Sequence, residues 1–388
     1  MLSRKKDKYE SRGMKYLEKK VEQREASDPL ELVLDFLISK NFLEKVVDYE
    51  NRSRITWRLG ELGKKMRKNL IDCWENSTSK KLGNIRFFPE ISERSGTEYF
   101  IELFDKNDMN APFGFSRVIE EPILEFSTPK FLFNDKYDRK LILEYATMPS
   151  NSKDMLLSWL DFTVDYLDKL NLKRDDLEIE YQTLEEDQDS DHYFFERFTI
   201  KNIYHFGVEQ IAAVNNKIDF EFENYDKKFP EDKKSKCFVH DELRNTDYFP
   251  HVIQIIIDVN KLILAVLLNN YHQERIRTSV ITTLKLSPQL APVKCAIFPL
   301  SVVDRKTKVT GERILALFNK HFNTVIEEKG TLEMRISDFN EIGVPFYVAV
   351  DPALVDDNIY WLYDNKFGTR SEVSEDDIIS YINAKINE

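Results

Sequence analysis

The chain has 388 residues and a formal net charge of −12, from 56 lysines and arginines against 68 aspartates and glutamates. Hydrophobic residues make up 42% and aromatic residues 12% of the sequence, which excludes a globally disordered chain because that much apolar material can form a sizeable core. The acidic total argues against a protein that coats nucleic acid over its whole surface, although it is compatible with a local basic patch.

Cysteine and histidine are scarce and scattered. The three cysteines (Cys73, Cys237 and Cys295) lie far apart, which excludes a disulfide scaffold and a Cys-x-x-Cys zinc site and fits a reducing compartment. We therefore expect no metal site and no cofactor. Polar and charged residues interrupt the longest apolar run, residues 252–268, so we predict no membrane segment, since a span needs about 20 apolar residues.

Residues 1–27 are predicted to form a charged tail. Eight of the first 20 residues are basic and three are acidic. Two interpretations stay open: a mitochondrial presequence, which is usually basic but poor in acids, or a solvated helical tail.

Hydrophobic spacing then predicts a series of helices and short strands. Helices are expected over residues 29–38, 61–76, 152–170, 201–214 and 261–271. Strands are expected over residues 85–88, 99–104, 113–119, 123–127, 141–145 and 251–257, with an edge strand at Phe220–Glu223. The acidic stretch 172–191 is either a strand followed by a solvated loop or a surface loop throughout.

The pattern changes after residue 284, where strands and helices alternate at the pace of an α/β unit of about 100 residues. Predicted strands lie in the apolar run 291–300, near Val325, and over residues 345–350 and 359–362, and predicted helices over residues 312–322, 334–342 and 375–386. A domain boundary is therefore predicted near residue 285.

Segment Leu284–Leu300 (LKLSPQLAPVKCAIFPL) resembles the start of the anticodon-binding domain of glycyl-tRNA synthetase and its class II relatives, and Glu341–Phe346 (EIGVPF) resembles a later strand entry. Leu59–Trp74 and Pro250–Leu262 are similar to the first and third class II motifs. The resemblance implies an α/β (α+β) fold: a class II synthetase-like antiparallel sheet with flanking helices over residues 28–284, and an anticodon-binding-like mixed α/β domain over residues 285–388.

The resemblance also implies a degenerate ATP site. The third motif of an active synthetase needs a glycine and an arginine that stacks on adenine, where this chain has Asp258 and Lys261, and lysine lacks the planar cation that stacks. Phe88 takes the place of the second motif's arginine, and an alternative alignment at residues 111–121 places no arginine correctly either. We therefore expect the chain not to be an enzyme.

Three further segments resemble the accessory subunit family of mitochondrial DNA polymerase gamma: Phe126–Pro129 (FSTP), Trp159–Phe162 (WLDF) and Phe206–Glu209 (FGVE). This implies a non-catalytic subunit that binds the catalytic subunit of the mitochondrial replicative DNA polymerase, raises its processivity and primer-template affinity, and resides in the mitochondrial matrix (nucleoid). Only residues 75–110 separate Trp74 from the next motif, too few for the helical insertion of vertebrate members. We therefore expect a monomer that forms a one-to-one complex.

Two residue sets are candidates for this role. Four basic residues of one predicted helix are candidates for DNA contact, although an ordinary solvated helix face explains them too: Lys64, Lys65, Arg67 and Lys68. Five residues of the C-terminal domain are candidate polymerase contacts, although each is compatible with a core position: Phe339, Ile342, Trp361, Tyr363 and Phe367. Two other hypotheses stay open, a glycyl-tRNA synthetase and a paralogous pseudo-synthetase that binds tRNA.

Overall fold

The computed structural model describes residues 29–47, 55–81, 84–88, 96–107, 112–122, 137–183, 194–204, 207–223, 238–241, 245–276, 279–301 and 303–388. These residues form two compact units, which are treated separately below. The first contains residues 74–168 and 172–265, and the second contains residues 27–73, 169–171 and 266–388.

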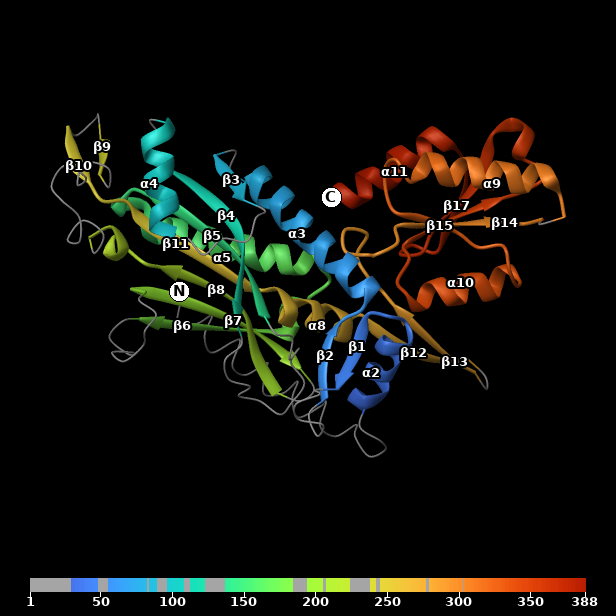
Figure 1. The fold of residues 1–388 in the computed structure, drawn as a ribbon, viewed down its shortest axis with the longest axis horizontal. Helices are drawn as coiled ribbons and strands as arrows, with labels where there is room; N and C mark the ends of the chain where they lie inside the picture. Colours follow the sequence, from blue (N-terminus) through green and yellow to red (C-terminus); the bar gives the residue numbers. More distant parts are fainter. Residues whose placement is uncertain are drawn as a thin grey trace. The chain divides into compact units, whose positions relative to one another are not determined.

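A seven-stranded sheet forms the centre of the first unit (Figure 1), in the order β3-β4-β5-β11-β8-β7-β6. The β3–β4 pair is parallel and every other neighbouring pair is antiparallel. Its strands are β3 (Ile85–Phe88), β4 (Phe113–Pro122), β5 (Tyr137–Thr147), β6 (Leu177–Thr183), β7 (Glu196–Tyr204), β8 (Gly207–Asn216) and β11 (His251–Asp258). A separate short pair joins β9 (Val239–Asp241) and β10 (Thr246–Tyr248).

The two faces of this sheet differ because successive side chains of a strand alternate between them. On one face, Trp159 of α5 (Ser152–Lys169) packs edge-on against Tyr145 of β5. Trp74 of α3 (Glu61–Lys81) donates its indole N–H to Ser116 on the same face, at 2.8 Å. On the other face, Phe100 of α4 (Gly96–Asn107) packs on β4 within an aromatic cluster.

The second unit centres on a five-stranded mixed sheet in the order β15-β14-β16-β17-β18. The β14–β15 and β14–β16 pairs are parallel, and β16–β17 and β17–β18 are antiparallel. Side chains of α9 and α11 share a core cluster with one face, and α10 packs against the other. The elements are β14 (Cys295–Pro299), α9 (Arg305–Phe318), β15 (Thr324–Ile326), α10 (Leu332–Glu341), β16 (Phe346–Val350), β17 (Ile359–Asp364), β18 (Thr369–Ser374) and α11 (Glu375–Asn387).

A helix and two hairpins complete the second unit. The antiparallel pairs are β1 (Leu43–Val47) with β2 (Ile55–Leu59), and β12 (Tyr271–Ile276) with β13 (Ser279–Leu284). Helix α2 (Pro29–Ser39) contacts the second pair, because Phe36 packs edge-on against Tyr271. Helix α8 (Val259–Asn269) begins in the first unit and ends in the second.

The expected fold class is confirmed: the structure is a mixed α/β fold with antiparallel-rich sheets and helices, consistent with a class II synthetase-like fold. Three local expectations were wrong. Within the expected helix 201–214, residues 201–204 and 207–214 lie in strands β7 and β8, residues 99–104 lie in helix α4 rather than a strand, and Phe220–Glu223 is a helical turn rather than an edge strand. Expected strand 123–127 and the tail at 1–27 lie outside the described residues, and the boundary near residue 285 stays a prediction.

Among the described helices, none combines the length and the apolar character that a membrane crossing requires.

Candidate active site

A row of polar side chains crosses the α4 face of the seven-stranded sheet. Strand pairing aligns Glu144 with Gln254, Gln254 with Asn215, and Asn215 with Arg197. The amide of Gln254 donates to Glu144 Oε1 at 3.0 Å, and the amide of Asn215 donates to Gln254 Oε1 at 3.1 Å. Four adjacent strands (β5, β11, β8 and β7) therefore place one polar side chain each in a row, and hydrogen bonds connect the first three of them.

Glu144 is the centre of this row. It is only 1% exposed, and its second oxygen, Oε2, has no hydrogen-bond partner within the described residues. Arg117 of β4 is 6% exposed and places Nη2 at 3.6 Å from that oxygen, close enough for an ion pair but beyond a hydrogen bond. Arg117 thus offsets the cost of burying this charged oxygen, and the oxygen keeps hydrogen-bond acceptor capacity that suits a bound ammonium group.

A second ion pair lies beside the first. Lys217 pairs with Glu221, and Thr97 donates its hydroxyl to Glu221 at 2.9 Å. Burial lowers the pKa of Lys217, with the positive charge of Arg117 acting in the same direction and the negative charge of Glu144 opposing it. The buried pair Arg117–Glu144 and the partly buried pair Lys217–Glu221 thus form one electrostatic cluster with no net formal charge.

Helix α4 limits the space next to Glu144. A Cβ atom added at Gly96, the first residue of α4, would overlap the carboxylate of Glu144, so only glycine lets the helix approach so closely. The ring of Tyr99, one turn further on, lies under the guanidinium of Arg117 at 5.3 Å. Helix α4 therefore leaves little room beside the Arg117–Glu144 pair. An adjacent acid and base of this kind match the carboxylate and ammonium groups of a small zwitterion.

Sequence reasoning missed these residues. Arg117, Glu144 and Gln254 each interrupt a strand that is otherwise apolar, as in residues 141–146 and 252–257. A charged residue inside such a strand is rarely buried without a partner or a function, and this was the available signal. It could not show which residues meet, because strand pairing brings together positions more than 100 residues apart, such as Glu144 and Gln254.

Two of the three predicted ATP-site positions, Asp258 and Lys261, lie together, and Phe88 lies apart from them. Phe88 ends β3 and packs its ring on Tyr99 at 4.9 Å. Asp258 ends β11, three strands away in sheet order, and caps the following helix by accepting from the Lys261 backbone N–H at 2.9 Å. The ammonium of Lys261 lies 3.7 Å from both Asp258 and Glu209. Their degeneracy as ATP-site positions stays a prediction.

The predicted DNA-contact residues lie on one helix, α3. Lys64 pairs with Glu61 at 3.1 Å and Lys68 pairs with Asp72 at 2.5 Å, so acids of the same helix balance part of the positive charge. Lys65 is exposed and Arg67 is half-buried. DNA contact by these four residues stays a prediction.

The predicted polymerase-contact residues fall into two environments. Phe339, Ile342 and Tyr363 are partly buried against the core between α10 and the sheet. Trp361 donates its indole N–H to Asp351 at 3.3 Å, and the guanidinium of Arg370 lies over its ring at 4.0 Å. Phe367, by contrast, is 59% exposed. Polymerase contact by this set stays a prediction.

No cluster of three or more histidine, cysteine, aspartate or glutamate side chains that could hold a metal ion occurs among the described residues.

Comparison with known proteins finds glycine–tRNA ligases. The chain is 24% identical over 374 residues to the enzyme of Clostridium tetani, covering 91% of this chain and 78% of the relative. It is 26% identical over 275 residues to that of Caldanaerobacter subterraneus, covering 71% of this chain and 58% of the relative. The match to that of Borrelia garinii is 24% over 338 residues. No protein-family model matches the chain.

These relatives correct the expectation that the chain is not an enzyme. Proteins similar to most of its length are named as ligases, which points to an enzyme. They also support the class II synthetase resemblance.

Proposed function

We propose that this chain is a glycine-handling enzyme of the glycyl-tRNA synthetase type, which activates glycine with ATP and transfers it to tRNA. The observation that carries the proposal is the buried ion pair of Arg117 and Glu144. It lies on the α4 face of a synthetase-like sheet, in a chain that is 24–26% identical to glycine–tRNA ligases.

The charges of the site match glycine. The Glu144 carboxylate receives the ammonium group of the amino acid through its unused oxygen Oε2. Arg117 receives the carboxylate, which leaves one oxygen to attack the α-phosphorus of ATP and displace pyrophosphate. Gln254 fixes the Glu144 carboxylate from the other side through its bond to Oε1. Without glycine, Arg117 Nη2 lies 3.6 Å from Glu144 Oε2, and this distance increases when glycine binds between the two groups.

The close approach of Gly96 supports glycine over larger amino acids. The site lacks space for an added Cβ atom on helix α4, and a bound amino acid with a side chain meets the same wall. One extra methyl group is worth roughly 10–200-fold in discrimination when it has no room.

The decisive measurement is glycine-dependent exchange of pyrophosphate into ATP, followed by glycine attachment to tRNA. We expect exchange with glycine, and at least about tenfold less with alanine. Glu144→Gln, which keeps the shape and removes the charge, should lower glycine-dependent exchange about 100-fold, because a charge-assisted contact to the ammonium is lost and Arg117 is left without its acid.

Glu180→Gln is the matched control. Glu180 lies on the same face of the same sheet and pairs with Lys201, but it sits on edge strand β6, away from Glu144. Its exchange rate should stay within about twofold of the unchanged protein. Absence of exchange in the folded, unchanged protein, with glycine binding also absent by calorimetry, would refute the proposal. Glycine binding without exchange would place the defect at the ATP positions Phe88, Asp258 and Lys261.

We propose as a second function that the chain associates with the catalytic subunit of the mitochondrial replicative DNA polymerase and with primer-template DNA, in the mitochondrial matrix. The exposed ring of Phe367 favours this. It carries the ammonium groups of Lys366 and Lys385 at 5.7 and 5.9 Å, and an exposed aromatic with flanking cations suits a protein contact. Primer extension tests it: products should lengthen when the chain is added, and Phe367→Ala should shorten them again.

A further inference from the structure

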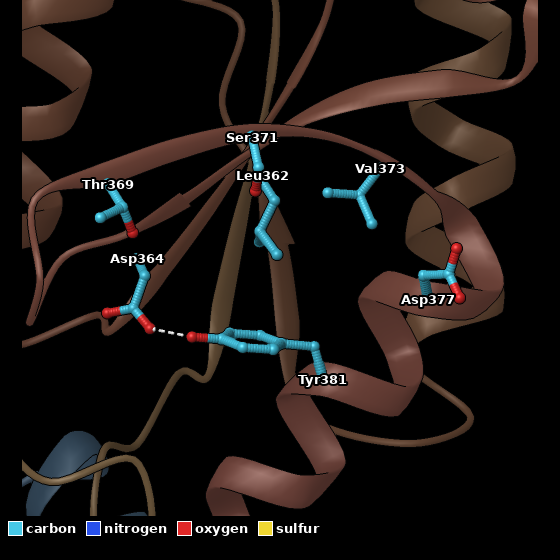
Figure 2. A pocket seen from close by; sticks show the side chains of 7 residues that line it. All are labelled: Leu362, Asp364, Thr369, Ser371, Val373, Asp377 and Tyr381. Atoms are coloured by element: carbon cyan, nitrogen blue, oxygen red, sulfur yellow. Dashed lines mark hydrogen bonds between the residues drawn. The ribbon is translucent and has the colours of Figure 1, made fainter.

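The second unit contains a pocket of about 310 Å³ between strands β17 and β18 and helix α11 (Figure 2). This volume lies at the lower end of the range of about 300–1,000 Å³ that small-molecule sites occupy. Seven residues line it: Leu362, Asp364, Thr369, Ser371, Val373, Asp377 and Tyr381. The pocket belongs wholly to the C-terminal sheet and its helix, so it is separate from the Glu144 site.

The lining carries negative charge at two separate places. Asp364 comes from the end of β17 and Asp377 from the first turn of α11, and Figure 2 shows them at opposite ends of the pocket. Leu362 and Val373 lie between the two carboxylates. No lysine, arginine or histidine is among the seven lining residues. The nearby Lys385 is outside the lining, and its ammonium pairs with Glu388 at 2.5 Å.

The inner carboxylate is held rigidly. Asp364 is only 4% exposed, and its Oδ1 accepts from the backbone N–H groups of Lys366 and Phe367 at 2.9 and 3.3 Å. Its Oδ2 accepts the hydroxyl of Tyr381 at 2.6 Å. Burial and the neighbouring Asp364 carboxylate raise the pKa of Tyr381 to about 12, so this hydroxyl stays protonated and donates at neutral pH. A carboxylate oxygen accepts about two bonds, so Oδ2 keeps one site for a ligand.

The outer carboxylate is exposed and anchored at one oxygen. The hydroxyl of Ser374 donates to Asp377 Oδ2 at 2.7 Å, which fixes the side chain at the start of α11 and leaves Oδ1 available. The ring of Tyr381 forms the wall between the two acids and suits methylene groups, and the ammonium group of Lys385 lies 5.9 Å from the centre of this ring.

We propose that this pocket binds a short aliphatic diamine, with one ammonium group on Asp364 and the other on Asp377, and with its methylene chain over Leu362, Val373 and the Tyr381 ring. The carboxylates at the two ends of the pocket favour a ligand with two positive charges, and the apolar side chains between them favour a hydrocarbon chain joining those charges. An anion such as phosphate or nucleic acid is disfavoured because both charged lining groups are negative. The inference is independent of glycine handling and adds a ligand to the C-terminal domain.

The test is isothermal titration calorimetry on the full chain with three probes that share a four-carbon chain: 1,4-diaminobutane, butylamine and 1,4-butanediol. We expect the diamine to bind, the monoamine to bind about tenfold more weakly through loss of one charge-assisted contact, and the diol not to bind. An N-acetyl-lysine amide probe distinguishes the source of the ammonium. If it binds as tightly as the diamine, the pocket takes a lysine side chain of a peptide and the diamine proposal is overturned.

Two variants locate the site. Asp377→Asn should lower diamine affinity about tenfold to the level of the monoamine, whereas Asp376→Asn should leave it unchanged. The control is close, because both are exposed aspartates in the first turn of α11, and only Asp377 lines the pocket. Ser371→Phe fills the pocket from edge strand β18 and should abolish binding, with folding checked by circular dichroism.

Equal losses in the two aspartate variants would mean that a diffuse negative field, and not the pocket, attracts the diamine. Equal affinity for the diamine and the diol would show that the positive charges of the ligand do not contribute to binding. Either result overturns the proposal.

Discussion

Lys294 is a buried cation that holds a chain segment in place. It is 7% exposed, and its Nζ donates to the carbonyls of Pro288 and Gln289 at 2.8 and 2.7 Å. Asn69 donates to the next two carbonyls, those of Leu290 and Ala291. This segment is the one whose sequence resembles the start of an anticodon-binding domain, so these donors give it a defined backbone path within the second unit.

Lys294 should make stability depend on pH. Burial lowers its pKa from 10.5 to about 7, with the positive charge of Lys68 adding to the lowering and Cys73 and Asp72 opposing it. Between these pH values the unfolded chain binds more protons than the folded chain, so the contribution of Lys294 to stability rises with pH from about 7 to about 10 and is constant below 7. The limiting slope is about 1.4 kcal/mol per pH unit.

The measurement is urea unfolding at about pH 7 and about pH 9, comparing the protein with Lys294→Met, which removes the titrating group. The variant should be less stable by about 1–3 kcal/mol at pH 7, because the carbonyls of Pro288 and Gln289 lose their donor, and the gap should widen at pH 9. Lys285→Met, at an exposed position, is the control, and its free energy of unfolding should change with pH as that of the unchanged protein does. The same pH dependence in Lys294→Met would contradict the pKa shift.

Individual site residues were the least predictable part of the molecule. Phe88, Asp258 and Lys261 were selected by alignment to a motif, but the structure keeps Phe88 in an aromatic cluster and Asp258 at a helix start. Glu144 and Arg117 were not selected, because their proximity depends on the register of β4 with β5. Register follows from the whole sheet, and a local pattern does not contain it.

At the level of elements, two helical glycines differ in what an added Cβ atom would meet: backbone at one position and side-chain ends at the other. Gly63 lies in the first turn of α3, and an added Cβ would overlap the backbone carbonyl of Phe42. Gly311 lies inside α9, where an added Cβ meets only the side-chain atoms Ile326 Cδ1 and Pro299 Cγ, at 3.1 and 3.2 Å. The backbone carbonyl at Gly63 cannot move to make room for the added atom, whereas the side-chain ends at Gly311 can.

Gly63→Ala should therefore destabilise the protein by about 2–3 kcal/mol, since overpacking against fixed atoms costs about that much. Gly311→Ala is its matched control and should change stability by less than about 1 kcal/mol, because the helix propensity gained by alanine offsets the tighter packing. Thermal unfolding of both variants checks this. Equal effects would show that the contact of α3 with Phe42 is not tight in solution.

The elements that were predicted correctly have local causes. Thr331 and Ser374 accept the backbone N–H bonds that start α10 and α11, and the apolar spacing that follows is visible in the sequence. Residues 201–214 were misread as a helix because Ala212, Ala213 and Val214 are buried on both faces of a central strand, so they lack the period-two pattern of a strand. Tertiary packing overrode local propensity there.

For the whole molecule, the net charge of −12 limits any electrostatic contact with nucleic acid. The basic face of α3 has four cations, and Lys64 and Lys68 are already paired with acids of that helix. A surface of this kind binds the phosphate backbone through few contacts, whether the partner is tRNA or primer-template DNA.

We therefore expect tRNA affinity to fall only moderately with salt, with a log–log slope between about −1 and −4, since each phosphate contact contributes about −0.7 to −0.9. Lys65→Glu should weaken binding and make the slope shallower by about one contact. Lys80→Glu, the same charge change at an exposed position at the far end of α3, should not alter the slope. Filter binding from 50 to 200 mM salt measures both, a range over which such contacts respond strongly. A slope steeper than about −6, or equal effects of the two variants, would place the nucleic-acid contact outside the α3 face.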